Sequence, residues 1–71
     1  MKIRYTDHSI ERFKERGISK SQVEEAVEKG RKEEVEGELR KSVHKNRKGM
    51  LAVIYFIQSS EEVAIVTAYW V

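Results

Sequence analysis

Cysteine and proline are both missing from the chain. Without cysteine the chain can form no disulfide, no thiolate metal site and no cysteine nucleophile, which fits a reducing compartment better than a small secreted domain. Long apolar runs are also missing, because the longest, residues 50–57, is far short of the ~20 residues that cross a bilayer. The N-terminus leads into polar residues rather than into the apolar core of a signal peptide. We therefore expect a cytoplasmic protein with no membrane partner.

Charge is plentiful but unevenly distributed along the 71 residues. A chain of this length supports one domain, residues 1–71, and its 14 Lys and Arg against 12 Asp and Glu give a net charge of +2. Residues 39–50 hold five basic residues and no acidic one, whereas residues 21–38 are acidic. A dense cationic segment suits RNA or DNA, because each neutralised phosphate releases counterions. It is also typical of a solvated strand that lysines protect from aggregation, and both interpretations stay open.

Two short helices are predicted in the first 30 residues. Thr6 or Asp7 can cap a helix that runs to about Arg16, and Gly17 suits the position after its last turn. Ser19 begins an S-x-x-Q capping box, which predicts the start of a second helix. The apolar positions of that helix recur at helical spacing until a glycine ends it: Val23, Ala26, Val27 and Gly30.

The rest of the chain has the patterns of strands and turns. From residue 32 the period shifts towards two, so that Arg40, Ser42 and His44 share one face of a strand. Residues 46–49 are a turn signal, residues 50–57 predict a central strand, residues 58–61 close a hairpin, and residues 63–71 predict a last strand. We predict an α+β fold with two N-terminal helices packed on one face of a three- or four-stranded antiparallel sheet. The other face stays open and is the natural place for a ligand.

His8, Arg12 and Arg16 are spaced by four and form one stripe on the first predicted helix. Ile10 and Phe13 centre on roughly the opposite side, so the stripe should look away from the core. The pattern does not decide between two directions, towards solvent or over the rim of the sheet. An ordinary exposed helix face, on which glutamates pair with neighbouring bases, fits the same spacing.

Two histidines near several cations form a minimal set for metal-free cleavage of an RNA phosphodiester. The imidazole of His8 or His44 can accept the 2′-hydroxyl proton or protonate the leaving oxygen, because imidazole titrates near neutral pH. Cations can stabilise the charge of the transition state. Tyr69 and Trp70 can stack on a base or pack in the sheet, whereas Tyr55 is expected to pack. We expect no metal or cofactor, because cysteine is missing and the basic segment holds no carboxylate.

The opening residues 6–19, T-D-H-S-I-E-R-F-K-E-R-G-I-S, resemble the T-x-H-A-x-x-R-x-x-x-R-G-I-S start of a bacterial and archaeal family of small domains of unknown function. Ser9 stands where alanine is more usual. That family is grouped with RelE-like toxins in the barnase, EndoU, colicin and RelE superfamily. The resemblance covers nearly the whole chain, and it implies a compact RelE-like α+β fold with metal-independent ribonuclease ancestry.

The resemblance carries over His8, Arg12 and Arg40, together with Thr67 and Tyr69, as site residues. With the chemistry above, the candidate catalytic residues are His8, Arg12, Arg40 and His44. The candidate nucleic-acid-binding residues are Arg16, Lys41, Lys45, Arg47, Lys48, Thr67 and Tyr69. The predicted function is that of an RNA-directed RelE-like protein, a metal-independent endoribonuclease toxin that acts on RNA or the ribosome and is neutralised by an antitoxin.

Two alternatives to the toxin remain. The first is a non-catalytic nucleic-acid-binding module that uses the same basic surface. The second is a protein-interaction domain that pairs through an exposed strand edge, with a cognate partner or with itself as a homodimer.

Overall fold

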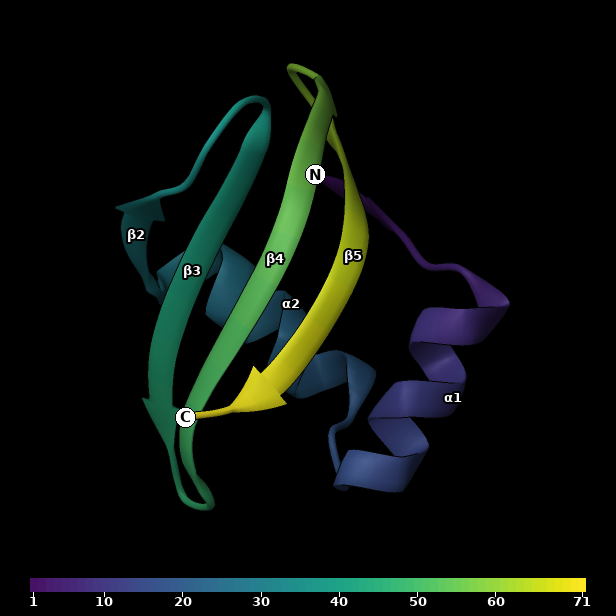
Figure 1. The fold of residues 1–71 in the computed structure, drawn as a ribbon, viewed down its shortest axis with the longest axis vertical. Helices are drawn as coiled ribbons and strands as arrows, with labels where there is room; N and C mark the ends of the chain where they lie inside the picture. Colours follow the sequence, from purple (N-terminus) through teal and green to yellow (C-terminus); the bar gives the residue numbers. More distant parts are fainter.

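A computed structural model describes all residues from 1 to 71 and contains two helices and five strands (Figure 1). In chain order the elements are β1 (Lys2–Arg4), α1 (Asp7–Arg16), α2 (Lys20–Lys29), β2 (Arg31–Glu34), β3 (Leu39–Asn46), β4 (Gly49–Ser59) and β5 (Glu62–Trp70). The α+β class and both predicted helices are confirmed. Neither helix is long and apolar enough to cross a membrane.

Helix α1 begins and ends where its local sequence predicts. Thr6 is the N-cap, and its hydroxyl accepts a hydrogen bond from the Ser9 amide at 3.0 Å while the Ser9 hydroxyl accepts one from the Thr6 amide at 3.0 Å. This reciprocal box satisfies two amides that the first turn leaves unpaired. Gly17 ends the helix with a φ of 65°, a left-handed conformation that glycine adopts without a steric penalty.

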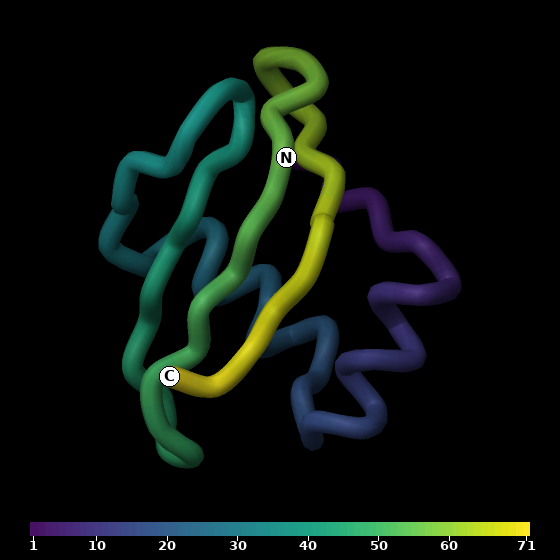
Figure 2. Tube along the Cα trace, in the orientation of Figure 1, coloured from purple at the N-terminus to yellow at the C-terminus, as the bar shows by residue number.

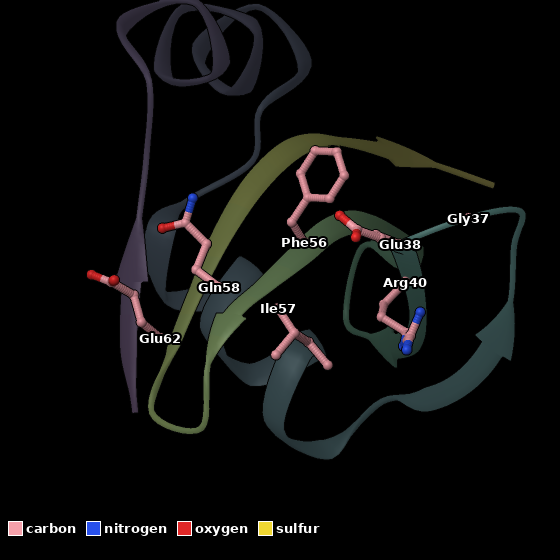
Figure 3. Close-up of a pocket in the computed structure, with 7 residues that line it drawn as sticks. All are labelled: Gly37, Glu38, Arg40, Phe56, Ile57, Gln58 and Glu62. Carbon is pink, nitrogen blue, oxygen red and sulfur yellow. The ribbon is translucent and has the colours of Figure 1, made fainter.

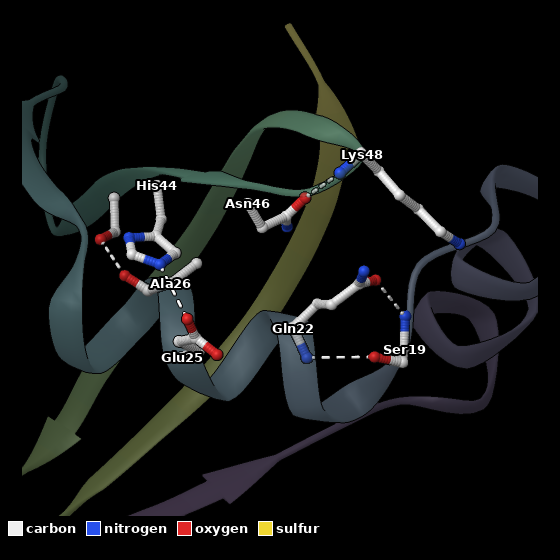
Figure 4. A network of polar contacts seen from close by, with 8 residues as sticks. Ser19, Gln22, Glu25, Ala26, His44, Asn46 and Lys48 are labelled. Atoms are coloured by element: carbon white, nitrogen blue, oxygen red, sulfur yellow. Dashed lines mark hydrogen bonds and ion pairs between the residues drawn. The ribbon is translucent and has the colours of Figure 1, made fainter.

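Helix α2 is capped in the same way and lies flat against the sheet. Ser19 and Gln22 form its capping box, as predicted (Figure 4). Its buried positions, Val23, Ala26 and Val27, form one stripe that contacts the sheet. The Ser42 hydroxyl of β3 donates to the Ala26 carbonyl and so fixes the helix to the strand below it.

The sheet has five strands in the order β1-β5-β4-β3-β2, with β1 parallel to β5 and all other pairs antiparallel (Figures 1 and 2). The prediction of three or four antiparallel strands is therefore wrong in number and in direction. The two additional strands are short, charged and at the edges: K-I-R in β1 and R-K-E-E in β2. Such segments lack an apolar alternation of their own, because only their pairing with β5 and β3 makes them strands.

The core lies between the two helices and one face of the sheet. It contains Phe13 and Ile18 of the helical segment together with Leu51, Val53 and Tyr55 of β4, all nearly inaccessible to solvent. Tyr55 therefore packs in the core, as predicted. The opposite face of the sheet is covered by no helix (Figure 1).

A β-bulge in β5 decides which residues of that strand reach the open face. Ile65 pairs with Tyr55 and Thr67 pairs with Ile54, so Val66 is an extra residue between two consecutive partners. Before the bulge, Val63 and Ile65 point into the core; after it, Ala68 does. Thr67 and Tyr69 consequently face away from the helices.

Candidate nucleic-acid interface

Arg16, at the last turn of α1, reaches across to the edge of β5. Its Nη1 donates to the carbonyl oxygen of Ala68 at 2.8 Å and to the Thr67 hydroxyl at 3.3 Å. Strand β1 pairs only with residues 62–64 of β5, and α1 borders the strand beyond that point. The guanidinium therefore saturates a strand-edge carbonyl, while most of the side chain stays exposed.

Side chains from the sheet side bind the backbone at the C-terminal end of α1. Trp70 Nε1 donates to the Arg16 carbonyl oxygen at 2.6 Å, and Lys48 Nζ donates to the Gly17 carbonyl oxygen at 3.1 Å. The last carbonyls of a helix have no partner within the helix and carry its negative dipole end, so an indole N–H and an ammonium are suitable caps. Strand β5 and the turn between β3 and β4 therefore hold the backbone from which the Arg16 side chain extends.

The stripe of His8, Arg12 and Arg16 faces outward, as its spacing predicts, because all three residues are exposed. Arg12 Nε lies 3.5 Å from His8 Nε2, and Arg12 Nη1 lies 3.7 Å from Glu15 Oε2. The structure also decides the direction that the spacing left open. The Arg16 end of the stripe lies over the rim of the sheet at β5, and the His8 end lies two turns away along the helix.

On the open face, the Lys41 side chain of β3 interacts with Glu33 of β2 and with Tyr69 of β5. Its ammonium lies 6.0 Å from the centroid of the Tyr69 ring and 3.5 Å from Glu33 Oε1. Interaction with Tyr69, the largest cause, and with Glu33 raises the pKa of Lys41 above its ordinary value. Hydrogen bonding from Arg31 is the main reason that the pKa of Glu33 is lowered. Lys41 is therefore a stable cation beside an aromatic ring.

The end of β3 and the turn that follows it supply cations that pair with no carboxylate. Lys45, Arg47 and Lys48 have no acidic oxygen within 4.0 Å, and Arg16 has none either. The Lys48 amide donates to Asn46 Oδ1 at 2.8 Å, which closes the turn and directs the Lys48 side chain towards the end of α1 (Figure 4). The basic segment and the first helix thus come into contact through Lys48.

His44 does not join the His8 end of the stripe. Its side chain lies on the face of β3 that α2 covers, where His44 Nε2 is 3.0 Å from Glu25 Oε1 (Figure 4). His8 lies on α1, which contacts β5, whereas α2 contacts β3 and β4. The sequence-based scheme in which both histidines serve one phosphodiester therefore has no geometry to support it, since strand alternation turns His44, like Ser42, towards α2.

Arg40 lies at the other end of β3. It is paired with Tyr55, its Nη1 donates to the Leu39 carbonyl oxygen at 3.1 Å, and it lines an open pocket with Phe56 and Ile57 (Figure 3). The cluster around Arg16 and Lys48 is at the opposite end of the sheet, where β5 finishes and the β3–β4 turn lies. Arg40 is therefore separate from the other candidate residues.

Sequence reasoning missed the contribution of Trp70, which was expected to stack or pack and instead also donates to α1. It also missed Glu33 and Phe56, both on the open face. No local motif marks these residues, because their positions depend on segments distant in sequence: Trp70 contacts α1, and Glu33 contacts Lys41 of the neighbouring strand. No group of three or more His, Cys, Asp or Glu side chains is arranged to hold a metal ion.

These observations define a small two-layer α+β protein with an uncovered sheet face and a cluster of unpaired cations at one end. The chain belongs to the family described as domain of unknown function DUF4258, whose family model matches residues 5–70. Comparisons with curated proteins and with solved structures gave no match. The family membership agrees with the resemblance of the opening segment, and the relation to RelE-like toxins stays a prediction.

Proposed function

We propose that the protein binds RNA through its phosphate backbone, with Arg16 at the centre of the contact surface, as an RNA-directed RelE-like protein. The surface consists of Arg16, Thr67 and Tyr69 at the end of β5, Lys41 and Lys45 on β3, and Arg47 and Lys48 in the turn. We call this set the basic end of the sheet. In a RelE-like toxin an antitoxin would cover such a surface.

The observation that carries the proposal is the bonding of Arg16. Arg4 and Arg31 each have a carboxylate at hydrogen-bond distance, at 2.6 Å and 2.9 Å. Arg16 is instead held by two neutral oxygens, so its charge is not compensated, and its position is fixed from the strand side. A pre-positioned guanidinium with spare N–H donors is well suited to a phosphate group.

The neighbouring cations support a chain of phosphates rather than a single anion. Thr67 and Tyr69 lie two residues apart on one face of β5, and Lys41 reaches that row from β3. Lys48 reaches the same end from the turn. Several cations spread over one end of a sheet, most of them without a carboxylate partner, favour a polyanion, because each phosphate contact releases its own counterions.

Cleavage of the bound RNA is a second candidate, favoured by the approach of His8 to Arg12. The neutral His8 imidazole would take the proton of a 2′-hydroxyl, whose oxygen attacks phosphorus to form a 2′,3′-cyclic phosphate. The bond to the 5′-oxygen breaks, and that oxygen takes a proton from water. Arg12 and Arg16 would stabilise the charge that develops on the phosphoryl oxygens.

Binding is tested by the fluorescence anisotropy of a short labelled oligoribonucleotide over a series of salt concentrations. Arg16→Ala should weaken binding about tenfold and reduce the slope of log K against log salt by about 0.7. Lys14→Ala, which removes the same charge from the same helix, is the matched control and should have little effect. Wild-type protein that binds no RNA at low salt would refute the proposal.

Cleavage is tested by incubating labelled RNA with the protein in EDTA. His8→Ala should abolish product formation, and His44→Ala, with its side chain under α2, should retain it. Equal loss in both variants, or no cleavage by the wild type, would remove the enzymatic candidate and leave the binding proposal standing.

A further inference from the structure

The open face of the sheet carries an apolar strip along its central strand. By strand alternation Met50, Ala52, Ile54 and Phe56 of β4 all point away from the helices. Phe56 is 38 % exposed, a large value for an aromatic side chain in the middle strand of a sheet. Ala52, in the middle of the strip, is inaccessible to solvent, so the exposed apolar surface is concentrated at Phe56. An aromatic side chain exposed on an uncovered sheet face suggests a ligand surface.

Cations and hydrogen-bonding groups border this strip on both sides. Lys41 and Lys45 lie on β3, and Thr67 and Tyr69 lie on β5. Two acidic residues at this face are engaged, Glu33 with Arg31 and Lys41, and Glu62 with Arg4, whereas Glu38 lines the pocket beside Phe56 and forms no ion pair (Figure 3). The face therefore combines two cations at its border, of which only Lys45 has no carboxylate partner, with apolar and aromatic side chains along its middle.

We propose that this face binds a single-stranded segment of RNA, with bases stacked on Phe56 and Tyr69 and phosphates held by the basic end of the sheet. This inference rests on the proposed function and specifies its ligand. A duplex buries its bases and offers mainly phosphates to a flat surface, whereas a single strand offers both phosphates and flat apolar rings. Only the single strand matches both features of the face.

The positions of the two aromatic residues require two different nucleotides. Tyr69 is paired with Ala52, and Phe56 lies four residues further along β4. Four residues of a strand extend about 13 Å, so one base cannot contact both rings. The ammonium of Lys41 lies near the Tyr69 ring, which places a phosphate-binding group next to one of the stacking positions.

The test compares three probes by fluorescence anisotropy: a single-stranded oligoribonucleotide, its duplex, and an abasic strand of equal phosphate number. Wild-type protein should bind the single strand about tenfold more tightly than the abasic strand. Phe56→Leu keeps the apolar volume without a flat ring and should remove most of this preference, as should Tyr69→Ala. Tyr69→Phe should retain it. Ile57→Ala is the matched control, because Ile57 lies next to Phe56 and points to the other face (Figure 3).

The outcomes separate this inference from the function on which it rests. Equal affinity for all three probes, lost on Arg16→Ala, would overturn the stacking face while the phosphate-binding proposal stands. No binding of any probe would overturn both. Sedimentation of the free protein supplies a further check: a dimer that Phe56→Leu dissociates would show that a second copy covers this face, and would overturn the inference. Circular dichroism confirms that each variant is folded.

Discussion

The indole of Trp70 donates a hydrogen bond at 2.6 Å to the carbonyl oxygen of Arg16, and the guanidinium of Arg16 donates at 2.8 Å to the carbonyl oxygen of Ala68 in the same strand. The end of α1 and the end of β5 are thus joined by two bonds of opposite direction. Any group that binds Arg16 meets a side chain whose base cannot move independently of the sheet.

Trp70→Phe should therefore lower both stability and RNA affinity. The substitution removes the donor to the Arg16 carbonyl and keeps most of the ring, so we expect a loss of about 1 kcal/mol in the free energy of unfolding, measured with urea. The RNA affinity should fall several-fold, because Arg16 loses its support. Lys48→Met removes the other helix cap together with a charge. If Trp70→Phe leaves both quantities unchanged, the bond has no role in positioning Arg16.

Arg16→Lys separates charge from geometry. The ammonium keeps the charge, so the salt dependence of binding should stay close to that of the wild type. It offers no planar fork of donors to reach Ala68, Thr67 and a phosphate together, so affinity should still fall several-fold. An affinity equal to that of the wild type would mean that only the charge at this position matters.

Glu33→Gln should strengthen RNA binding. Glu33 neutralises Arg31 and Lys41 on the open face, at 2.9 Å and 3.5 Å, and its removal leaves both cations free. We expect the affinity to rise several-fold at low salt. Glu34→Gln makes the same change in net charge at the next residue, which forms no ion pair, and its effect should be clearly smaller. Equal effects of both variants would point to net charge alone.

Stability should decline at alkaline pH. Burial is the main cause that raises the pKa of Tyr5 and of Tyr55, and a hydrogen bond to Glu24 adds to the effect at Tyr5. Above pH ~10 the unfolded chain releases these phenolic protons while the folded protein retains them, so folding becomes less favourable as the pH rises. Tyr5→Phe should flatten the decline in unfolding free energy between pH 9 and 11, in roughly the ordinary range of tyrosine titration. A decline as steep as that of the wild type would contradict this assignment.

Gly30→Ala should destabilise the fold without affecting the ligand surface. A Cβ at this position would meet the Ala26 carbonyl oxygen and the Ser42 hydroxyl, the two groups that join α2 to β3. Overpacking of this kind costs about 1–3 kcal/mol in the free energy of unfolding. Gly37→Asn is the comparison, because a Cβ added at Gly37 would have no other residue's atom within 4 Å beyond its chain neighbours, and asparagine tolerates the positive φ of this position. If Gly30→Ala leaves the free energy of unfolding unchanged, the contact between α2 and β3 can relax to accept the methyl group.

The helices were predictable because their signals are local. The boxes at Thr6 and Ser19 and the stop at Gly17 act within a few residues, and the structure follows them. The outward stripe of α1 was predictable from spacing for the same reason. Strands β1 and β2 were not predictable, because these segments of three and four mostly charged residues become strands only by pairing with β5 and β3.

The sequence indicates which residues are candidates for the site, but not on which face or at which end of the sheet each of them lies. Alternation from Val63 and Ile65 places Thr67 and Tyr69 in the core, and only the extra residue at Val66 turns them to the open face. The same alternation places His44 under α2 beside Glu25, away from His8. The contact of Lys48 with the end of α1 depends on a turn whose direction its sequence does not specify.

The extra residue at position 66 also determines which sequence changes β5 can tolerate: substitutions at this position, but not its deletion. The two halves of β5 have different roles. Before the bulge, Val63 and Ile65 pack in the core; after it, Thr67 and Tyr69 present their hydroxyls on the open face. Many side chains could replace Val66 at little cost, since the residue is 41 % exposed. A deletion there would rotate every later residue by half a turn, sending a tyrosine inward and an alanine outward. In this strand the count of residues matters more than their identity.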